Sequence, residues 1–84
     1  MKYYKDKGYD KAIIGVDDKN RIVYDKHKMI EILMGQGMTD EEAIEFLEYN
    51  VWSAYVGEHT PIYVDLMDIN EINELWTINT NTSN

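Results

Sequence analysis

The chain contains no cysteine, which excludes a disulfide framework, a thiolate nucleophile and any cysteine-ligated zinc or iron–sulfur site. No apolar run approaches the roughly 18 residues that a membrane-spanning helix needs. The lysine-containing start also lacks the apolar segment of a signal peptide. These absences predict a soluble, cytoplasmic protein whose stability comes from packing alone.

Basic residues are missing from residues 29–84, which carry eleven acids (16 − 5 = 11). All eight lysines and arginines lie in residues 1–28 beside the other five acids, so that this part has a net charge of 8 − 5 = +3. A segment with eleven uncompensated acids repels polyanions and attracts basic surfaces. Direct nucleic-acid binding is therefore disfavoured. The alternative reading is a solvated acidic face that serves only solubility.

The length of 84 residues predicts one small domain over residues 1–84 with a thin core. Hydrophobic residues make up 44% of the chain, which is enough for a globular fold. Residues 1–10 mix lysine, aspartate and tyrosine without a clear period, so they are either a flexible arm or a short edge strand. Residues 77–84 form a polar, uncharged tail that we expect to fray.

Two runs of strand-forming residues, Ala12–Val16 and Arg21–Tyr24, predict a β-hairpin. They are separated by Asp-Asp-Lys-Asn, which are turn-forming residues. Because side chains alternate along a strand, we expect Ile14 and Val16 to share one face of the hairpin and to contribute to a small apolar surface.

A first helix is predicted from Lys26 to Met34, with Asp25 as its N-cap. Its apolar residues recur at helical spacing on one face, and they are Met29, Ile30, Leu33 and Met34. Gly35 and Gly37 should end it, because glycine accepts the left-handed backbone found at helix C-termini.

A second helix has the strongest local signal in the chain. Thr39 and Glu42 form a capping box, and the acids of the first turn complement the helix dipole. We expect this helix to continue to Gly57. Its predicted apolar face consists of Ala43, Ile44, Leu47, Val51 and Ala54.

Residues 61–67 alternate as in a third strand, which we expect to join the hairpin. Asp68 and Glu71 then repeat a capping pattern ahead of a short helix near residues 69–76. The predicted fold class is therefore α+β, in the order β-β-α-α-β with a possible C-terminal helix.

Motifs for catalysis or cofactor binding are not found in the sequence. His27 and His59 lie in no metal motif, no serine stands in a nucleophile elbow, and no glycine-rich phosphate loop is present. The segment that begins at Asp17 lacks the glycine and the last glutamate of a calcium loop. We therefore expect no enzymatic activity, no metal and no cofactor.

The second helix carries an acidic stripe on the side away from its predicted apolar face. Glu41, Glu45 and Glu48 are spaced by four and three residues, with Tyr49 and Trp52 alongside. Like charges at this spacing destabilise a helix slightly, whereas acids around aromatic residues suit a binding surface. The alternative is that Trp52 packs against the first helix or the N-terminal arm and the acids are merely solvated.

A second acidic group follows towards the C-terminus and is also expected to take part in partner binding. Its members are Asp65, Asp68, Glu71 and Glu74.

Three stretches, GVDDKNRIVYDKHKMIEIL, MTDEEAIEFLEYN and GEHTPIYV, resemble a set of short, uncharacterised proteins encoded by bacteriophages and prophages. The resemblance covers roughly residues 12–64. It implies a non-enzymatic inhibitor or modulator of a host protein, such as an anti-CRISPR or other anti-defence protein. The implied partner is a nuclease, a polymerase or another nucleic-acid enzyme, whose basic surface would accept carboxylates in place of phosphates.

Two other functions remain open from the sequence. The first is a homo-oligomeric structural or ligand-holding module, in which Tyr49 and Trp52 are buried against a second copy. The second is a protein that sequesters a small signalling nucleotide, for which only the basic residues 1–28 could supply the cations.

Overall fold

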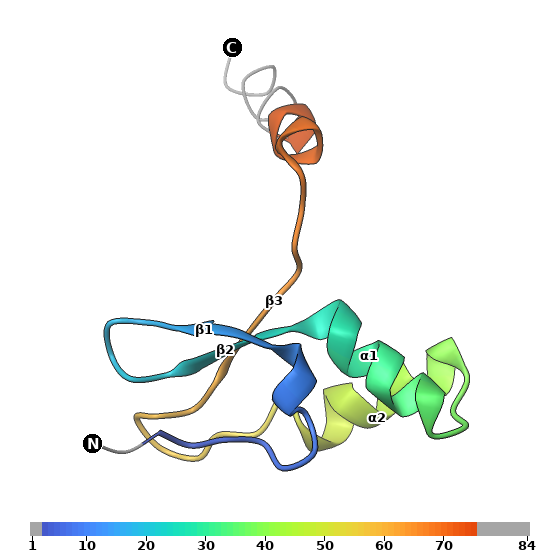
Figure 1. Ribbon diagram of the computed structural model, residues 1–84, viewed down its shortest axis with the longest axis horizontal. Coiled ribbons are helices and arrows are strands. Elements are labelled where there is room, and N and C mark those ends of the chain that lie inside the picture. The colour runs from blue at the N-terminus through green and yellow to red at the C-terminus, as the bar shows by residue number, and fades with distance from the viewer. Residues whose placement is uncertain (1–2, 76–84) are drawn as a thin grey trace.

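The computed structural model describes residues 3–75 and confirms the α+β class. A 3-10 helix, η1 (Asp10–Ala12), precedes the hairpin strands β1 (Ile13–Val16) and β2 (Ile22–Asp25). Two helices follow, α1 (Lys26–Gly35) and α2 (Asp40–Asn50), and then strand β3 (Ile62–Val64), as Figure 1 shows.

The three strands form one sheet in the order β1-β2-β3. The predicted hairpin is confirmed: β1 pairs antiparallel with β2, and Asn20 takes a positive φ of 61° in the turn between them. β3 joins the hairpin, as predicted, and pairs parallel with β2. Because parallel neighbours need a long crossover connection, α1 and α2 lie in the chain between these two strands.

A β-bulge in β1 changes which side chains share a face. Ile13 pairs with Tyr24, Gly15 with Val23 and Val16 with Ile22, which leaves Ile14 as the unpaired extra residue of the bulge. The alternation on which the prediction for Ile14 and Val16 rested is therefore interrupted between Ile13 and Gly15.

The register divides the sheet into two faces. One face carries Tyr24 and Tyr63 and packs on the core. The other face, which we call the open sheet face, carries apolar residues that neither belong to the core nor pack against it. These residues are Ile14, Val23, Ile62 and Val64.

The predicted helix starts are confirmed. Asp25 is the N-cap of α1, and its Oδ1 accepts hydrogen bonds from the backbone N–H groups of His27 at 3.0 Å and Lys28 at 3.5 Å. Thr39 and Glu42 form a complete capping box on α2. Between the helices, Gly37 has a φ of 106°, which explains why glycine is needed there.

The second helix is shorter than expected, since α2 ends at Asn50 and not at Gly57. Val51 leaves the helical region, with φ −127° and ψ −60°. The backbone N–H groups of Val51 and Trp52 both donate to the carbonyl of Leu47, at 2.9 and 2.7 Å, which closes the helix. Ala54 is exposed as a result and is not part of the apolar face.

The core lies between the sheet and the two helices. It is built from buried apolar residues of η1, β2, α1 and α2 and from one tyrosine that precedes η1, namely Tyr9, Ala12, Ile22, Tyr24, Met29, Leu33, Ala43 and Leu47. Of the predicted face of α1, Met29 and Leu33 are buried, whereas Met34 is exposed.

The N-terminal segment forms no strand in its described residues, 3–10, so the suggested edge strand is absent there. Tyr9 is buried, and the backbone N–H of Asp6 donates to the hydroxyl of Tyr24 at 2.8 Å. The hydroxyl of Tyr63 donates to the carboxylate of Asp6 at 2.6 Å. These contacts attach residues 6–12 to the core.

The C-terminal segment leaves the body of the protein after β3, which is shorter than the predicted strand over residues 61–67. Residues 69–75 are helical, and Asp68 and Glu71 cap this helix through reciprocal hydrogen bonds of 3.2 and 2.9 Å. The predicted last helical residue, 76, and the predicted tail, 77–84, lie outside the described residues.

Candidate protein-binding surface on α2

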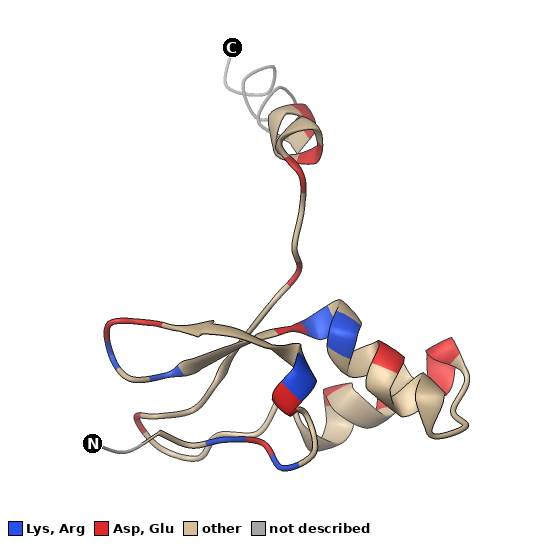
Figure 2. Ribbon diagram, viewed as in Figure 1, with Lys and Arg blue, Asp and Glu red and all other residues tan. Residues whose placement is uncertain are grey.

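Charge is distributed unevenly over the described part of the protein (Figure 2). The lysines and arginines lie in the N-terminal segment, in the hairpin turn and in the first turn of α1. α2 contains five acids and no base, and no ion pair within residues 3–75 involves any of these acids. α2 is therefore an anionic surface without internal compensation.

The predicted acidic stripe is present on α2. Glu41, Glu45 and Glu48 are all exposed, on the side of the helix opposite the buried Ala43 and Leu47. Their spacing places them on successive turns, so that Glu41 and Glu45 are about 6 Å apart along the helix axis.

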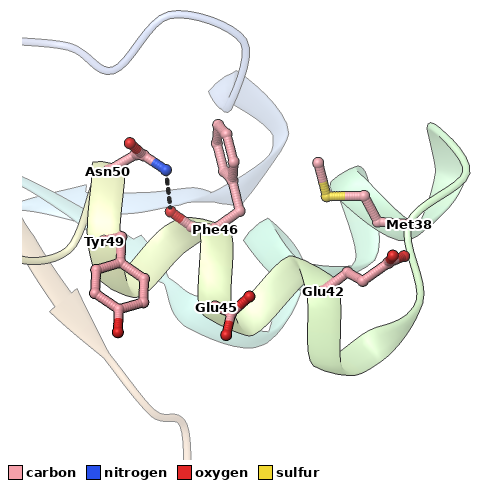
Figure 3. A pocket seen from close by; sticks show the side chains of 6 residues that line it. All are labelled: Met38, Glu42, Glu45, Phe46, Tyr49 and Asn50. Atoms are coloured by element: carbon pink, nitrogen blue, oxygen red, sulfur yellow. Dashed lines mark hydrogen bonds between the residues drawn. The ribbon is translucent and has the colours of Figure 1, made fainter.

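Beside the stripe, α2 carries a shallow hollow, shown in Figure 3. It is lined by Met38, Glu42, Glu45, Phe46, Tyr49 and Asn50. Tyr49 is 78% exposed and points to the same side of the helix as Glu45. Phe46 is 39% exposed and lies on the same helix.

Sequence reasoning missed Phe46 and Met38 as surface residues. The signal was available for Phe46, since it follows Glu42 by four residues and precedes Tyr49 by three, and such residues are neighbours on a helix. Met38 lies before the helix, so that only the path of the preceding turn could place it there. The hollow thus combines two acids with two aromatic rings and a thioether.

Trp52 does not belong to this surface. It lies beyond the end of α2 and packs half-buried against α1, where its indole N–H donates to the sulfur of Met29 at 3.4 Å. The ammonium group of Lys26 lies 4.4 Å from the centre of its ring. The prediction that placed Trp52 alongside the acidic stripe was wrong, because α2 ends before it, and the alternative that Trp52 packs against the first helix is confirmed.

The second acidic group lies on another part of the molecule. Asp65, Asp68, Glu71 and Glu74 are exposed on the segment that leaves the body after β3, apart from α2 (Figure 2). Asp65 forms an ion pair with Lys26 at 3.8 Å, and Glu71 caps the C-terminal helix. The structure therefore does not bring the two acidic groups together.

Other polar side chains offer no alternative site in the described residues. His27 faces Glu31 at 3.3 Å on the exposed side of α1, and His59 lies 3.3 Å from the carbonyl of Asn20. Within residues 3–75, no three histidine, aspartate or glutamate side chains are grouped so that they could hold a metal ion. No helix in this part of the chain is long and apolar enough to cross a membrane.

The fold and this surface define a small α+β protein with an exposed acidic helix that also carries aromatic residues. Comparisons with protein-family models, with curated proteins and with solved structures found no match to the chain. The support for α2 as a binding surface therefore comes from its geometry and its charge.

Proposed function

We propose that the protein is a non-enzymatic binding protein that docks α2 onto a basic surface of another protein. The observation that carries this proposal is the exposure of Tyr49 and Phe46 among five acids that form no ion pair with any residue from 3 to 75. Aromatic residues contribute strongly to protein interfaces, and the surrounding acids accelerate association with a cationic partner.

Binding would combine two effects on one helix. Glu41, Glu45 and Glu48 present carboxylates about 4.5 to 6 Å apart along the axis, so they can occupy positions at which a basic groove holds phosphates. Tyr49 and Phe46 would be buried against the rim of that groove, which adds the apolar contact that phosphates lack. The protein would thus exclude nucleic acid from its target.

The target class that fits this surface is a nuclease, a polymerase or another enzyme that binds nucleic acid. In its most specific form the proposal is a phage-encoded inhibitor of a host enzyme, of the anti-CRISPR or another anti-defence type, that acts in the host cytoplasm. This form is supported by the resemblance of residues 12–64 to phage-encoded proteins. The chain itself would not bind DNA or RNA, because its net charge is −8.

The test is a pull-down from bacterial lysate with tagged protein, washed at low salt and at about 1 M salt, since salt screens charges on exposed surfaces. A nucleic-acid enzyme that is retained at low salt and released at high salt supports the proposal. The same enzyme should be lost when Glu41, Glu45 and Glu48 are replaced by glutamine.

The matched control removes the same number of charges elsewhere, through Asp18→Asn, Glu31→Gln and Glu58→Gln, all at exposed positions outside α2. Partner retention should survive this change. If both triple variants retain the partner equally, α2 is not the binding surface.

A further inference from the structure

The open sheet face is an apolar surface that is neither part of the core nor packed against it. Ile14 is 44% exposed, and Val23, Ile62 and Val64 are half-buried. All four side chains are branched at Cβ and lie on adjacent strands in one layer. A sheet usually buries one such face against a helix, and here the helices α1 and α2 pack with the opposite face.

The C-terminal arm, residues 65–75, has the complementary feature. Its helix places Ile69, Ile72 and Leu75 on one side at spacings of three residues, and they are 65%, 48% and 51% exposed. Leu66 and Met67, which precede the helix, are also exposed. The arm stands away from the body in Figure 1, so the chain exposes both an apolar helix and an uncovered apolar sheet face.

We propose that two copies of this chain exchange their C-terminal arms, so that the helix of each copy covers the open sheet face of the other. The arm is acidic throughout, with four acids and no base. The hairpin and the first turn of α1, residues 13–28, hold four bases beside three acids. A second copy therefore offers a surface of matching apolar character and opposite charge.

The exchange also satisfies the geometry of a closed dimer. Each copy has one donor helix and one acceptor face, so a two-fold axis fills both faces and leaves no free site for a third copy. The two dockings bury the apolar side of the arm helix and the open sheet face in both copies. This makes a specific interface of at least roughly 1,000 Å² attainable for a small chain. The surface on α2 takes no part in the exchange.

The test begins with sedimentation of the full chain. A dimer of twice the chain mass is expected. It should persist at about 1 M salt, because its main contact is apolar, and salt screens the arm-to-hairpin attraction and the repulsion between two chains of net charge −8 alike. This response is the opposite of that expected for the α2 partner, so failure of one proposal can be distinguished from failure of the other.

Two pairs of matched variants locate the contacts. Ile72→Asp should yield monomers, whereas Asn70→Asp, which adds the same charge on the other side of the helix, should not. Ile14→Lys should yield monomers, whereas Val16→Lys should not, because Val16 is also exposed but lies on the other face of the sheet.

Mixing the two monomeric variants gives the decisive result. The Ile72→Asp chain keeps an intact sheet face and the Ile14→Lys chain keeps an intact helix, so that a mixed dimer with one docked helix should form where neither variant dimerises alone. A wild-type chain that is monomeric at all concentrations overturns the proposal. So does a wild-type dimer that no helix or sheet variant dissociates, or a mixture that stays monomeric.

Discussion

The hydroxyl of Tyr63 on β3 donates a hydrogen bond of 2.6 Å to the carboxylate of Asp6 in the N-terminal segment. The ring of Tyr63 stacks on that of Tyr24, with 5.7 Å between the ring centres, and the hydroxyl of Tyr24 accepts from the backbone N–H of Asp6. Two strands and the N-terminal segment are thus joined at one polar cluster on the edge of the core.

Replacing Tyr63 with phenylalanine should therefore destabilise the fold. The change keeps the stacked ring but leaves the partly buried carboxylate of Asp6 without its donor, which costs about 1 to 2 kcal/mol. Urea unfolding followed by circular dichroism measures the loss. Tyr55→Phe is the control, because Tyr55 is 81% exposed, and its effect should stay within about 0.5 kcal/mol. Equal stability of the two variants would contradict the role of the cluster.

The same cluster predicts sensitivity to alkaline pH. Burial, together with the charge of Asp6, raises the pKa of Tyr24 to about 12 and raises that of Tyr63 as well. The two tyrosines keep their protons in the folded state at a pH near 10, where the unfolded chain releases them. The stability that they contribute is therefore fully present below about pH 10 and is lost as the pH rises through about 12.

We expect the two tyrosines to ionise together with unfolding, when tyrosinate absorbance and circular dichroism are followed against pH. A Tyr24→Phe/Tyr63→Phe variant should lose less stability between about pH 9 and pH 12 than the wild type does. The stability of each protein is compared with its own value near neutral pH. Parallel declines in the two proteins would refute this assignment.

Truncation of Trp52 should affect the stability of the fold, whereas truncation of Tyr49 should affect partner binding. Trp52→Ala removes the ring that packs on Met29 and Lys26, and we expect it to lower the free energy of unfolding by about 2 kcal/mol or more. Tyr49→Ala should change stability by no more than about 0.5 kcal/mol but should weaken retention of the α2 partner. Urea unfolding and the lysate pull-down, performed on both variants, separate a structural aromatic residue from a binding one.

The N-cap of α1 should contribute measurably to stability. Asp25 is only 4% exposed, and Asp25→Ala removes the acceptor for two backbone donors, at a cost of about 1 to 2 kcal/mol in the unfolding free energy. Asp25→Asn keeps an acceptor oxygen at the same place and should recover most of this loss. A thermal or urea titration that ranks asparagine no better than alanine would show that charge, and not capping, is what matters there.

Elements that depend on neighbouring residues were predictable from the sequence. Asp25 caps α1, and the pairs Thr39 with Glu42 and Asp68 with Glu71 form reciprocal caps, because each bond joins groups within three residues. The hairpin turn, the order of the elements and the exposure of the acidic stripe on α2 also followed from local spacing.

Features that depend on distant residues were not predictable. The N-terminal segment is ordered through Tyr24 and Tyr63, and the period of its own residues carries no sign of that. The bulge in β1 depends on how this strand pairs with β2. Trp52 packs on α1, and spacing counted along an unbroken helix placed it on the acidic side.

The parallel pairing of β3 with β2 has a consequence for synthesis on the ribosome. β2 is the central strand, yet its second neighbour is translated only after both helices, and the donor to Asp6 lies 57 residues further along the chain. When only the hairpin and α1 have emerged from the ribosome, β2 therefore has an unpaired edge and the N-terminal segment lacks its contact with Tyr63. Contacts this distant in sequence form late and slowly. The growing polypeptide would acquire protection from proteases only once Tyr63 has emerged.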